Sequence, residues 1–312
     1  MTNSDTAFYS QKNILKIAAV TGLYLIVSVL LLGFKTDQLV LAGIFNSFYF
    51  FSPASRKFIL AFAIFIVYWV IYDYMKAFPN YKFNSVHIED LYGAEKSLFG
   101  INATGKIITP NEYWIANQNS FLDVMTGVFY LCWIPVPLAF AAWLFFKDKN
   151  LFLQFSLTFV SVNFIGFIIY YVYPAAPPWY IQEHGNTFIA NTAGNTAGLV
   201  RFDKLLGVTI FQNLYSKGSN VFAAMPSLHS SYPLVVFYYG LKKKMGLFMN
   251  IIFATVMVGI WFAAVYTSHH YVLDVLAGIA CAILAIVLFQ NILMKNPLFN
   301  RFLNRFHKII AS

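Results

Sequence analysis

The sequence is poor in charged residues and in cysteine. Only 11% of its 312 residues are charged, whereas 59% are hydrophobic and 19% are aromatic. Soluble domains carry about 25% charged residues, so this composition argues against a soluble protein and predicts an integral membrane protein. The two cysteines, Cys132 and Cys281, both fall inside apolar runs, which argues against a disulfide framework and against a cysteine metal site.

Seven apolar runs are long enough to be read as membrane-crossing helices, which need about 20 such residues. The runs are 14–34, 58–75, 121–146, 151–172, 221–241, 247–267 and 271–294. Pro226 and Pro233 interrupt the fifth run, and Pro135 and Pro137 should kink the third. Residues 39–52 are apolar but shorter, and we interpret them as interfacial or re-entrant. The sequence therefore predicts an all-α polytopic membrane helix bundle of about seven transmembrane helices, with interfacial helices, in a single integral membrane domain over residues 1–312.

The connections between these runs differ in charge and length. With seven spans, the short basic connections share one face, and the positive-inside rule makes that face cytoplasmic. The basic segments are Arg56–Lys57, 147–150, 242–244 and the tail 295–312. The long connections 77–120 and 174–222 and the turn Ser268–His269 then lie on the opposite face. The net charge of +9 is explained by orientation and anionic lipid, so no nucleic-acid partner is implied.

Two histidines and an aspartate lie at the mouths of two late apolar runs. His229 belongs to MPSLHS, and His270 and Asp274 belong to YTSHHYVLD. Residues four apart share one face of a helix, so Asp274 is expected to orient the His270 imidazole. Two imidazoles can supply a nucleophile and a general acid or base. The pattern predicts histidine-based phosphoryl transfer that needs no cofactor and no metal, whereas the alternative is that each histidine caps a helix at the interface.

The location of these groups bears on the class of protein. His229, His270 and Asp274 all lie near the predicted non-cytoplasmic surface, while the centres of the spans are almost free of charge. A transporter would carry ionisable residues near mid-membrane within repeated halves. The distribution favours an enzyme at the membrane interface, although a catalytically silent lipid-binding or transport protein remains an alternative.

The two long connections contain three further candidate features. Arg201 and Lys204, in RFDKLLG, can bind phosphate, or they can form an exposed salt-bridged face. Residues 91–99 (LYGAEKSLF) have helical spacing, so they predict a helix in the membrane plane with Glu95 on a solvated face. Residues 174–180 (PAAPPWY) predict a rigid interfacial turn, because proline removes backbone donors.

Taken together, these motifs resemble the last two signatures of the type 2 phosphatidic acid phosphatase superfamily. His270 follows His229 by 41 residues (270 − 229), and HYVLD gives the spacing His-x-x-x-Asp. The runs NTAGLVRFDKLLG, SNVFAAMPSLHS and YTSHHYVLDVLAG, with PAAPPWY, are similar to fungal inositol phosphorylceramide synthases within it. The resemblance covers roughly residues 170–280 and implies the six-helix core of that superfamily.

The sequence departs from the phosphatases of the superfamily at two points. Ala263 and Ala264 stand where those phosphatases have Ser-Arg, and the first phosphatase signature, with its Lys and Arg, is absent near Pro174. Sphingolipid headgroup transferases of the superfamily similarly lack that arginine. The departures therefore favour a transferase over a lipid phosphatase that hydrolyses a phosphomonoester.

The resemblance implies a sphingolipid synthase. Such an enzyme transfers phosphoinositol from phosphatidylinositol to the primary hydroxyl of ceramide or dihydroceramide, and diacylglycerol is the second product. His270, oriented by Asp274, would form a phosphohistidine, and His229 would serve as acid and then as base. Phosphoethanolamine is the alternative headgroup.

The resemblance also implies the partners and the location. The partners would be a phospholipid donor and a ceramide-type acceptor, and the sequence does not report on an accessory subunit. Backbone donors near Ser227, with Arg201 or Lys204, would hold the phosphate, and His269 would have a structural or headgroup-contacting role. The active site would face the periplasm of a bacterial inner membrane or the lumen of the Golgi.

Overall fold

The computed structural model describes residues 10–216, 218 and 220–311, most of which are helical. The chain divides into two compact units. The first takes in the chain as far as Phe78 together with the residues from Arg301 onward, and the second runs from Pro79 to Asn300. The prediction of a single integral membrane domain stays a prediction.

The first unit is built from three helices in sequence, together with the part of the last helix, α16 (Pro297–Ala311), that begins at Arg301. The three helices are α2 (Gln11–Leu32), α3 (Thr36–Phe51) and α4 (Pro53–Tyr74), followed by the short helix η1 (Met75–Ala77). Ser52 ends α3 and caps α4, because its Oγ accepts a hydrogen bond from the N–H of Ser55 at 3.1 Å. Ile17, Tyr49 and Ile59 pack in one cluster, one from each helix.

The segment 39–52 is therefore largely helical. The 16 residues of α3, at about 1.5 Å each, span about 24 Å, which is less than the roughly 30 Å of a bilayer's hydrocarbon core.

The second unit holds the longer helices that surround the histidines. They are α7 (Ser120–Leu131), α8 (Pro135–Lys147), α9 (Lys149–Val172), α13 (Leu228–Lys243), α14 (Leu247–Tyr266) and α15 (Val272–Asn291). Helix α13 packs against α8, α9, α14 and α15, so it occupies the middle of this bundle. The short helix η4 (Leu293–Lys295) and the amphipathic helix α16 (Pro297–Ala311) complete the chain.

Six helical segments are long and apolar enough to cross a membrane, among the residues that the structure describes. They are Gln11–Leu32, Pro53–Ala77, Ser120–Lys147, Lys149–Val172, Leu247–Tyr266 and Val272–Lys295. The all-α polytopic bundle is confirmed, and the fifth predicted run differs. Its helix α13 has only 16 residues and begins at Leu228, because Ser227 caps it and residues 221–227 carry no helix.

The third predicted span bends as its prolines indicate. Helix α7 ends at Leu131 and α8 begins at Pro135, with a turn between them. Proline lacks an N–H and restricts the residue before it, so it tolerates the first position of a helix and disrupts the turn that precedes it. The break places Trp133 beside the histidine site described below.

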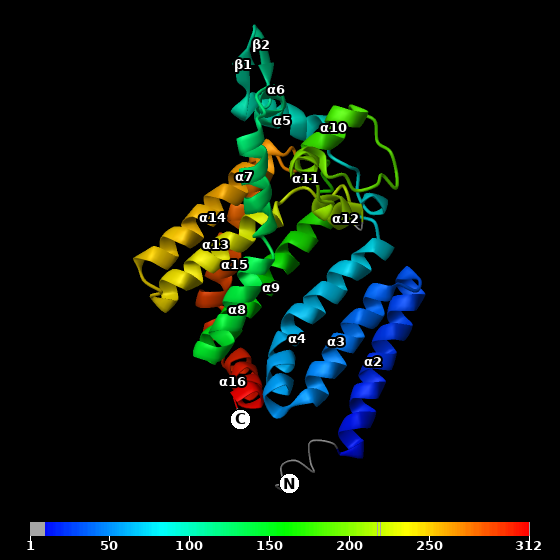
Figure 1. Ribbon diagram of the computed structural model, residues 1–312, viewed down its shortest axis with the longest axis vertical. Helices are drawn as coiled ribbons and strands as arrows, with labels where there is room; N and C mark the ends of the chain where they lie inside the picture. The colour runs from blue at the N-terminus through cyan, green and yellow to red at the C-terminus, as the bar shows by residue number, and fades with distance from the viewer. Residues whose placement is uncertain (1–9, 217, 219, 312) are drawn as a thin grey trace. The chain divides into compact units, whose positions relative to one another are not determined.

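Shorter elements lie at one end of the second unit, where Figure 1 shows α5, α6, α10 and α11 gathered. They are η2 (Asn80–Lys82), α5 (Glu89–Phe99), α6 (Pro110–Ala116), α10 (Pro178–His184), η3 (Ala197–Leu199), α11 (Val200–Leu206) and α12 (Ile210–Ser216). Strands β1 (Ile101–Ala103) and β2 (Lys106–Ile108) form an antiparallel pair in which Asn102 faces Ile107. These elements come from the two long connections.

The PAAPPWY segment is non-helical as far as Pro177 and then enters a helix. Pro178 begins helix α10, a position that proline tolerates because the first helical N–H has no partner in the helix. Trp179 and Tyr180 are buried in a cluster with Ile88, Ala176 and Phe222.

Candidate active site

The two motif histidines meet although they belong to different elements. His229 is the second residue of α13, and its Nδ1 lies 3.0 Å from Nε2 of His270. The side chain of His270 is buried, with 5% of its surface exposed. The structure therefore brings together the two imidazoles that the sequence placed at separate helix mouths.

Asp274 approaches His270 from the start of helix α15, and the two residues are not on one helix. Helix α15 begins at Val272 with Tyr271 as its N-cap, so His270 precedes the helix and shares no helical face with Asp274. The expectation of a shared helical face is therefore wrong. Asp274 instead accepts the N–H of Tyr271 at 2.8 Å, at the start of the helix. The same Oδ2 atom lies 3.6 Å from Nδ1 of His270, which is an ion-pair distance and longer than a hydrogen bond. Asp274 thus faces Nδ1 and leaves Nε2 directed at His229.

Aromatic side chains from the break between α7 and α8 surround His229. The hydroxyl of Tyr130 lies 3.1 Å from Nδ1 of His229, and the ring of Trp133 meets the imidazole edge-on at 4.4 Å. Tyr130 is fully buried. The sequence does not single out either residue, because each is one aromatic among many in an apolar run, and only the prolines that follow mark this place as unusual.

His269 has a structural contact, one of the two roles expected for it. Its ring stacks between those of Tyr130, at 5.4 Å, and Tyr215, at 4.5 Å. Its Nε2–H donates to the carbonyl of Thr196 at 3.0 Å. Burial, with a smaller effect from His270, lowers the pKa of His269 to about 3, so this imidazole is neutral at physiological pH.

Arg201 is held by an acidic partner from another element. Its Nε donates to Oδ1 of Asp123, in the first turn of α7, at 2.6 Å, and the hydroxyl of Tyr266 donates to the same oxygen at 2.9 Å. The guanidinium lies 5.3 Å from the centre of the Tyr266 ring, four residues before His270. One terminal nitrogen, Nη2, is buried with no hydrogen-bond partner among the described residues. Arg201 therefore has a fixed position and donor capacity to spare.

The two other predicted phosphate contacts are placed differently. Lys204 is exposed on α11. Ser227 is fully buried, its N–H donates to the carbonyl of Asp274 at 2.9 Å, and its Oγ accepts from the hydroxyl of Ser230 at 3.0 Å. The N–H of Ser227 is thus occupied in joining α13 to α15. A role in phosphate binding stays a prediction for both residues.

Glu95 is not on a solvated face. It is fully buried, and its two oxygens accept the N–H groups of Val272, at 2.9 Å, and Leu273, at 3.0 Å. Its place beside Leu91 on the apolar side of α5 was the signal available in the sequence, because residues four apart lie on one helix face. A carboxylate on an apolar stripe requires a donor, and here the donors belong to the first turn of α15.

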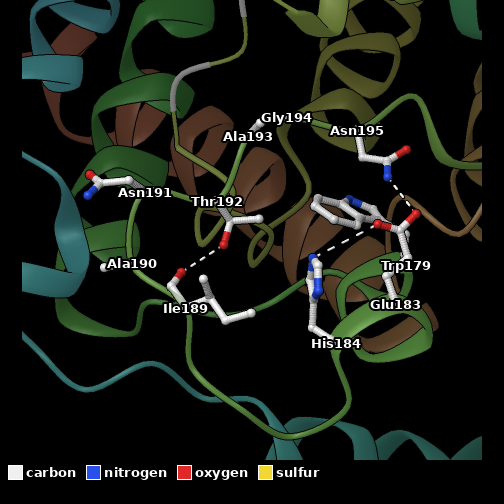
Figure 2. Close-up of a pocket in the computed structure, with 10 residues that line it drawn as sticks. All are labelled: Trp179, Glu183, His184, Ile189, Ala190, Asn191, Thr192, Ala193, Gly194 and Asn195. Carbon is white, nitrogen blue, oxygen red and sulfur yellow. Dashed lines mark hydrogen bonds and ion pairs between the residues drawn. The ribbon is translucent and has the colours of Figure 1, made fainter.

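A cavity of about 360 Å³ lies beside helix α10 (Figure 2). Its lining consists of Trp179, Glu183, His184 and residues 189–195. Figure 2 shows the Glu183 carboxylate between the Asn195 amide, which donates to it at 2.6 Å, and the His184 ring. The N–H of Trp179 donates to the carbonyl of Ser268 at 3.1 Å, so the cavity wall is bonded to the turn that carries His270.

No group of three or more His, Cys, Asp or Glu side chains is arranged to hold a metal ion in the part of the chain that the structure describes. The chemistry that this site can perform is carried by imidazole, carboxylate, phenol and guanidinium groups. Two facing imidazoles, one beside a carboxylate, can supply a nucleophile and a proton carrier.

Comparison with known proteins identifies relatives over most of the chain. The model of the PAP2 superfamily matches residues 105–288. A phosphoinositol dihydroceramide synthase from Bacteroides thetaiotaomicron is 41% identical over 302 residues, which cover 96% of this chain and 99% of that protein. The inositol phosphorylceramide synthase catalytic subunit AUR1 from Saccharomyces cerevisiae is 31% identical over 248 residues, 77% of this chain and 58% of that protein. No solved structure matches the chain.

Proposed function

The chain belongs to the PAP2 superfamily, and we propose that within it the protein is a sphingolipid synthase. It transfers phosphoinositol from phosphatidylinositol to the primary hydroxyl of a ceramide or dihydroceramide and releases diacylglycerol. The observation that carries this proposal is the 3.0 Å contact between Nε2 of His270 and Nδ1 of His229, in a chain similar to named phosphoinositol transferases over most of its length.

The first half-reaction forms a covalent intermediate on His270. Its Nε2 attacks the phosphorus of the donor, the bond from phosphorus to the diacylglycerol oxygen breaks, and His229 protonates that oxygen as it leaves. Asp274, 3.6 Å from Nδ1, stabilises the positive charge that the ring acquires. The product is a phosphohistidine that carries the inositol phosphate, together with free diacylglycerol.

The second half-reaction reverses the roles at the phosphorus. His229, now neutral, takes the proton from the ceramide hydroxyl, and the oxygen attacks the phosphohistidine. The bond from phosphorus to nitrogen breaks, and His270 returns to its starting state. Because the imidazoles are 3.0 Å apart, the donor phosphate must enter between them and separate the rings before either step.

Arg201 is the cation best placed to stabilise the phosphoryl oxygens. Its Nε is fixed by Asp123, and the spare donor capacity lies on Nη2. Prearranged cationic donors lower the energy of a transition state in which charge develops on oxygen. Ala263 and Ala264 stand where the phosphatases have Ser-Arg, and both are fully buried in a packed cluster with Tyr130 and Phe202. The absence of that arginine supports a transferase.

The cavity beside helix α10 has the chemistry to receive the inositol ring. Its lining provides a carboxylate, an imidazole, amides and a hydroxyl, and it includes no lysine or arginine. Such groups hydrogen-bond the hydroxyls of a neutral polyol, and a volume of about 360 Å³ falls in the usual range for small-molecule sites. We place the headgroup of the donor there.

The site is expected on the non-cytoplasmic side of the membrane, which would be the periplasmic face in a bacterium. The support is the distribution of basic residues between the short connections and the tail. The long connections that build α5, α6, α10 and α11 belong to the opposite side.

The test is an assay of purified protein in detergent micelles with labelled ceramide and a panel of phospholipid donors. Labelled phospholipid product and free phosphate are measured in the same tube, with His270→Ala alongside. We expect product with phosphatidylinositol alone, and none from the variant. Free phosphate from a phosphomonoester lipid, without ceramide product, would leave a phosphatase and contradict the proposal.

A further inference from the structure

We infer that Glu95, supported by Asn111, is a positioning residue for the catalytic histidine. Both residues lie in the connection before the third span, far from the catalytic motifs in sequence. Neither touches the imidazole itself, and both bind the backbone on which His270 and Asp274 are mounted. The inference rests on the proposed function for its assay but concerns a different part of the chain.

Glu95 fixes the start of helix α15. Its two carboxylate oxygens accept the N–H groups of Val272 and Leu273, and the side chain is fully buried. These are the first two residues of α15, whose N–H groups have no partner inside the helix. A carboxylate suits that position because it accepts two hydrogen bonds and opposes the positive end of the helix dipole.

The contact does more than cap a helix. Helix α15 already has a cap of its own, in which Asp274 accepts the N–H of Tyr271. Glu95 comes from another element, 177 residues earlier than Val272. Because these hydrogen bonds join segments that are distant in sequence, they locate α15 relative to α5. They therefore set the position of Asp274 relative to the ring of His270.

Asn111 fixes the other side of the same turn. Its Nδ2 donates to the carbonyl of Val265 at 2.8 Å and to the carbonyl of His270 at 2.9 Å. The first carbonyl is in the last turn of α14, and the second belongs to the catalytic residue itself. Asn111 is fully buried, within helix α6, whose start is closed by a capping box between Thr109 and Glu112.

The two side chains together clamp the segment 265–273 from outside the bundle. Buried polar groups are stable where they find hydrogen-bond partners. Both oxygens of Glu95 and Nδ2 of Asn111 find theirs on this segment, while Oδ1 of Asn111 has no partner among the described residues. The 3.6 Å contact between Nδ1 of His270 and Oδ2 of Asp274 has no direct hydrogen bond to maintain it. Its geometry depends on the backbone bonds that Glu95 and Asn111 supply.

The experiment compares Glu95→Gln with Glu89→Gln in the full-length purified protein. Glu89 is an exposed carboxylate on the same helix and serves as the matched control. Glutamine keeps the size of the side chain but turns an N–H₂ group toward one of the two backbone donors. We expect kcat to fall about 10–100-fold, by analogy with the loss of a residue that orients a metal-ligating histidine, with the donor KM changed less than about twofold. Asn111→Ala should show the same division between kcat and KM.

A second measurement separates positioning from a purely structural role. Single-turnover formation of the labelled phosphoenzyme should be slowed by Glu95→Gln to the same extent as kcat, in protein that elutes as a single species from a sizing column. A variant that unfolds more easily but labels at the wild-type rate would overturn the inference.

Failure of the proposed function is recognised separately. If the wild-type protein transfers nothing from phosphatidylinositol, the same comparison is made on whichever lipid turnover His270→Ala abolishes. Equal kcat for Glu95→Gln and Glu89→Gln in that reaction would contradict the positioning role.

Discussion

Nε2 of His270 and Nδ1 of His229 lie 3.0 Å apart, although 41 residues (270 − 229) separate them in the chain. The contact is made by the first turn of α13 and by the turn that precedes α15. Ser227 ties these two places together, because its N–H donates to the carbonyl of Asp274 at 2.9 Å. The proposed function depends on this pair of histidines. Asp274 faces Nδ1 of His270, so Nε2 is the ring nitrogen that can attack phosphorus.

The first prediction concerns the division of labour between His270 and Asp274. His270→Ala should abolish transfer, whereas Asp274→Asn should lower kcat about 10²–10⁴-fold, the range for losing a group that supports a catalytic histidine. The measurement is kcat and donor KM in the ceramide assay, with Asp90→Asn as the control from an exposed position. An Asp274→Asn enzyme as fast as the wild type would show that the carboxylate does not support the ring.

The second prediction concerns Tyr130. Its hydroxyl lies 3.1 Å from Nδ1 of His229, so Tyr130→Phe removes one polar neighbour and keeps the ring. A neutral hydrogen bond is worth about 0.5–1.5 kcal/mol, which corresponds to a loss of up to about tenfold in kcat. Tyr238→Phe, on the same helix as His229, is the control. Unchanged rates in both variants would mean that Tyr130 only packs against the imidazole.

The third prediction separates the two candidate cations. Arg201→Gln should raise donor KM and lower kcat, because the guanidinium held by Asp123 is lost. Asp123→Asn should do the same more weakly, because Arg201 keeps its charge but loses its anchor. Lys204→Gln, at an exposed site, should behave like the wild type. The measurement is kcat and KM at varied donor concentration. A larger effect of Lys204→Gln than of Arg201→Gln would assign phosphate binding to Lys204.

The fourth prediction concerns pH. Burial lowers the pKa of His269 to about 3 in the folded protein, whereas an unfolded chain has its histidines near about 6.5. Between these values the unfolded chain binds a proton that the folded protein does not, so the free energy of unfolding should fall as the pH falls below about 6.5. Above that pH this residue makes no pH-dependent contribution.

The change that tests it is His269→Gln, which keeps a donor for the carbonyl of Thr196 and cannot titrate. The melting temperature in detergent, followed from pH 7 to pH 4, should drop less steeply for this variant than for the wild type. His307→Gln, in helix α16, is the control. Parallel curves for all three proteins would rule out His269 as the source of acid sensitivity.

The fifth prediction concerns the cavity of Figure 2. Glu183→Ala and Asn195→Ala remove a bonded pair from its lining, so the KM for phosphatidylinositol should rise about tenfold, as expected for one or two lost hydrogen bonds. The KM for ceramide should stay the same. Asn117→Ala, in the other long connection, is the control. A raised KM for ceramide, with the KM for phosphatidylinositol unchanged, would show that the donor headgroup binds elsewhere.

Much of the fold was predictable because the bilayer imposes long apolar runs. The runs identified six spans and a bend at Pro135. The helix of the fifth run is shorter than predicted, because hydropathy does not register that Ser227 caps it and that residues 221–227 carry no helix. The grouping of His229, His270 and Asp274 in one site was predictable because they are polar groups at the mouths of apolar runs.

The residues that contact the histidine site from other elements could not be predicted from the sequence, for a different reason. Glu95, Asn111 and Tyr130 act through contacts made 99 to 178 residues away in the chain, and a single sequence carries no record of which distant segments meet. The start of α15 was misjudged for a local reason. Asp274 satisfies the Tyr271 N–H, so the helix begins after His270 and not before it.

The most direct test of the account is to trap the covalent intermediate. Purified protein is mixed with phosphatidylinositol labelled in its inositol ring, without ceramide, and quenched in alkali because phosphohistidine is labile to acid. Peptide mass spectrometry then locates the label. We expect inositol phosphate on His270, and its release as labelled ceramide product when ceramide is added before the quench. Label on His229, or rapid transfer with no labelled histidine at any time, would contradict it.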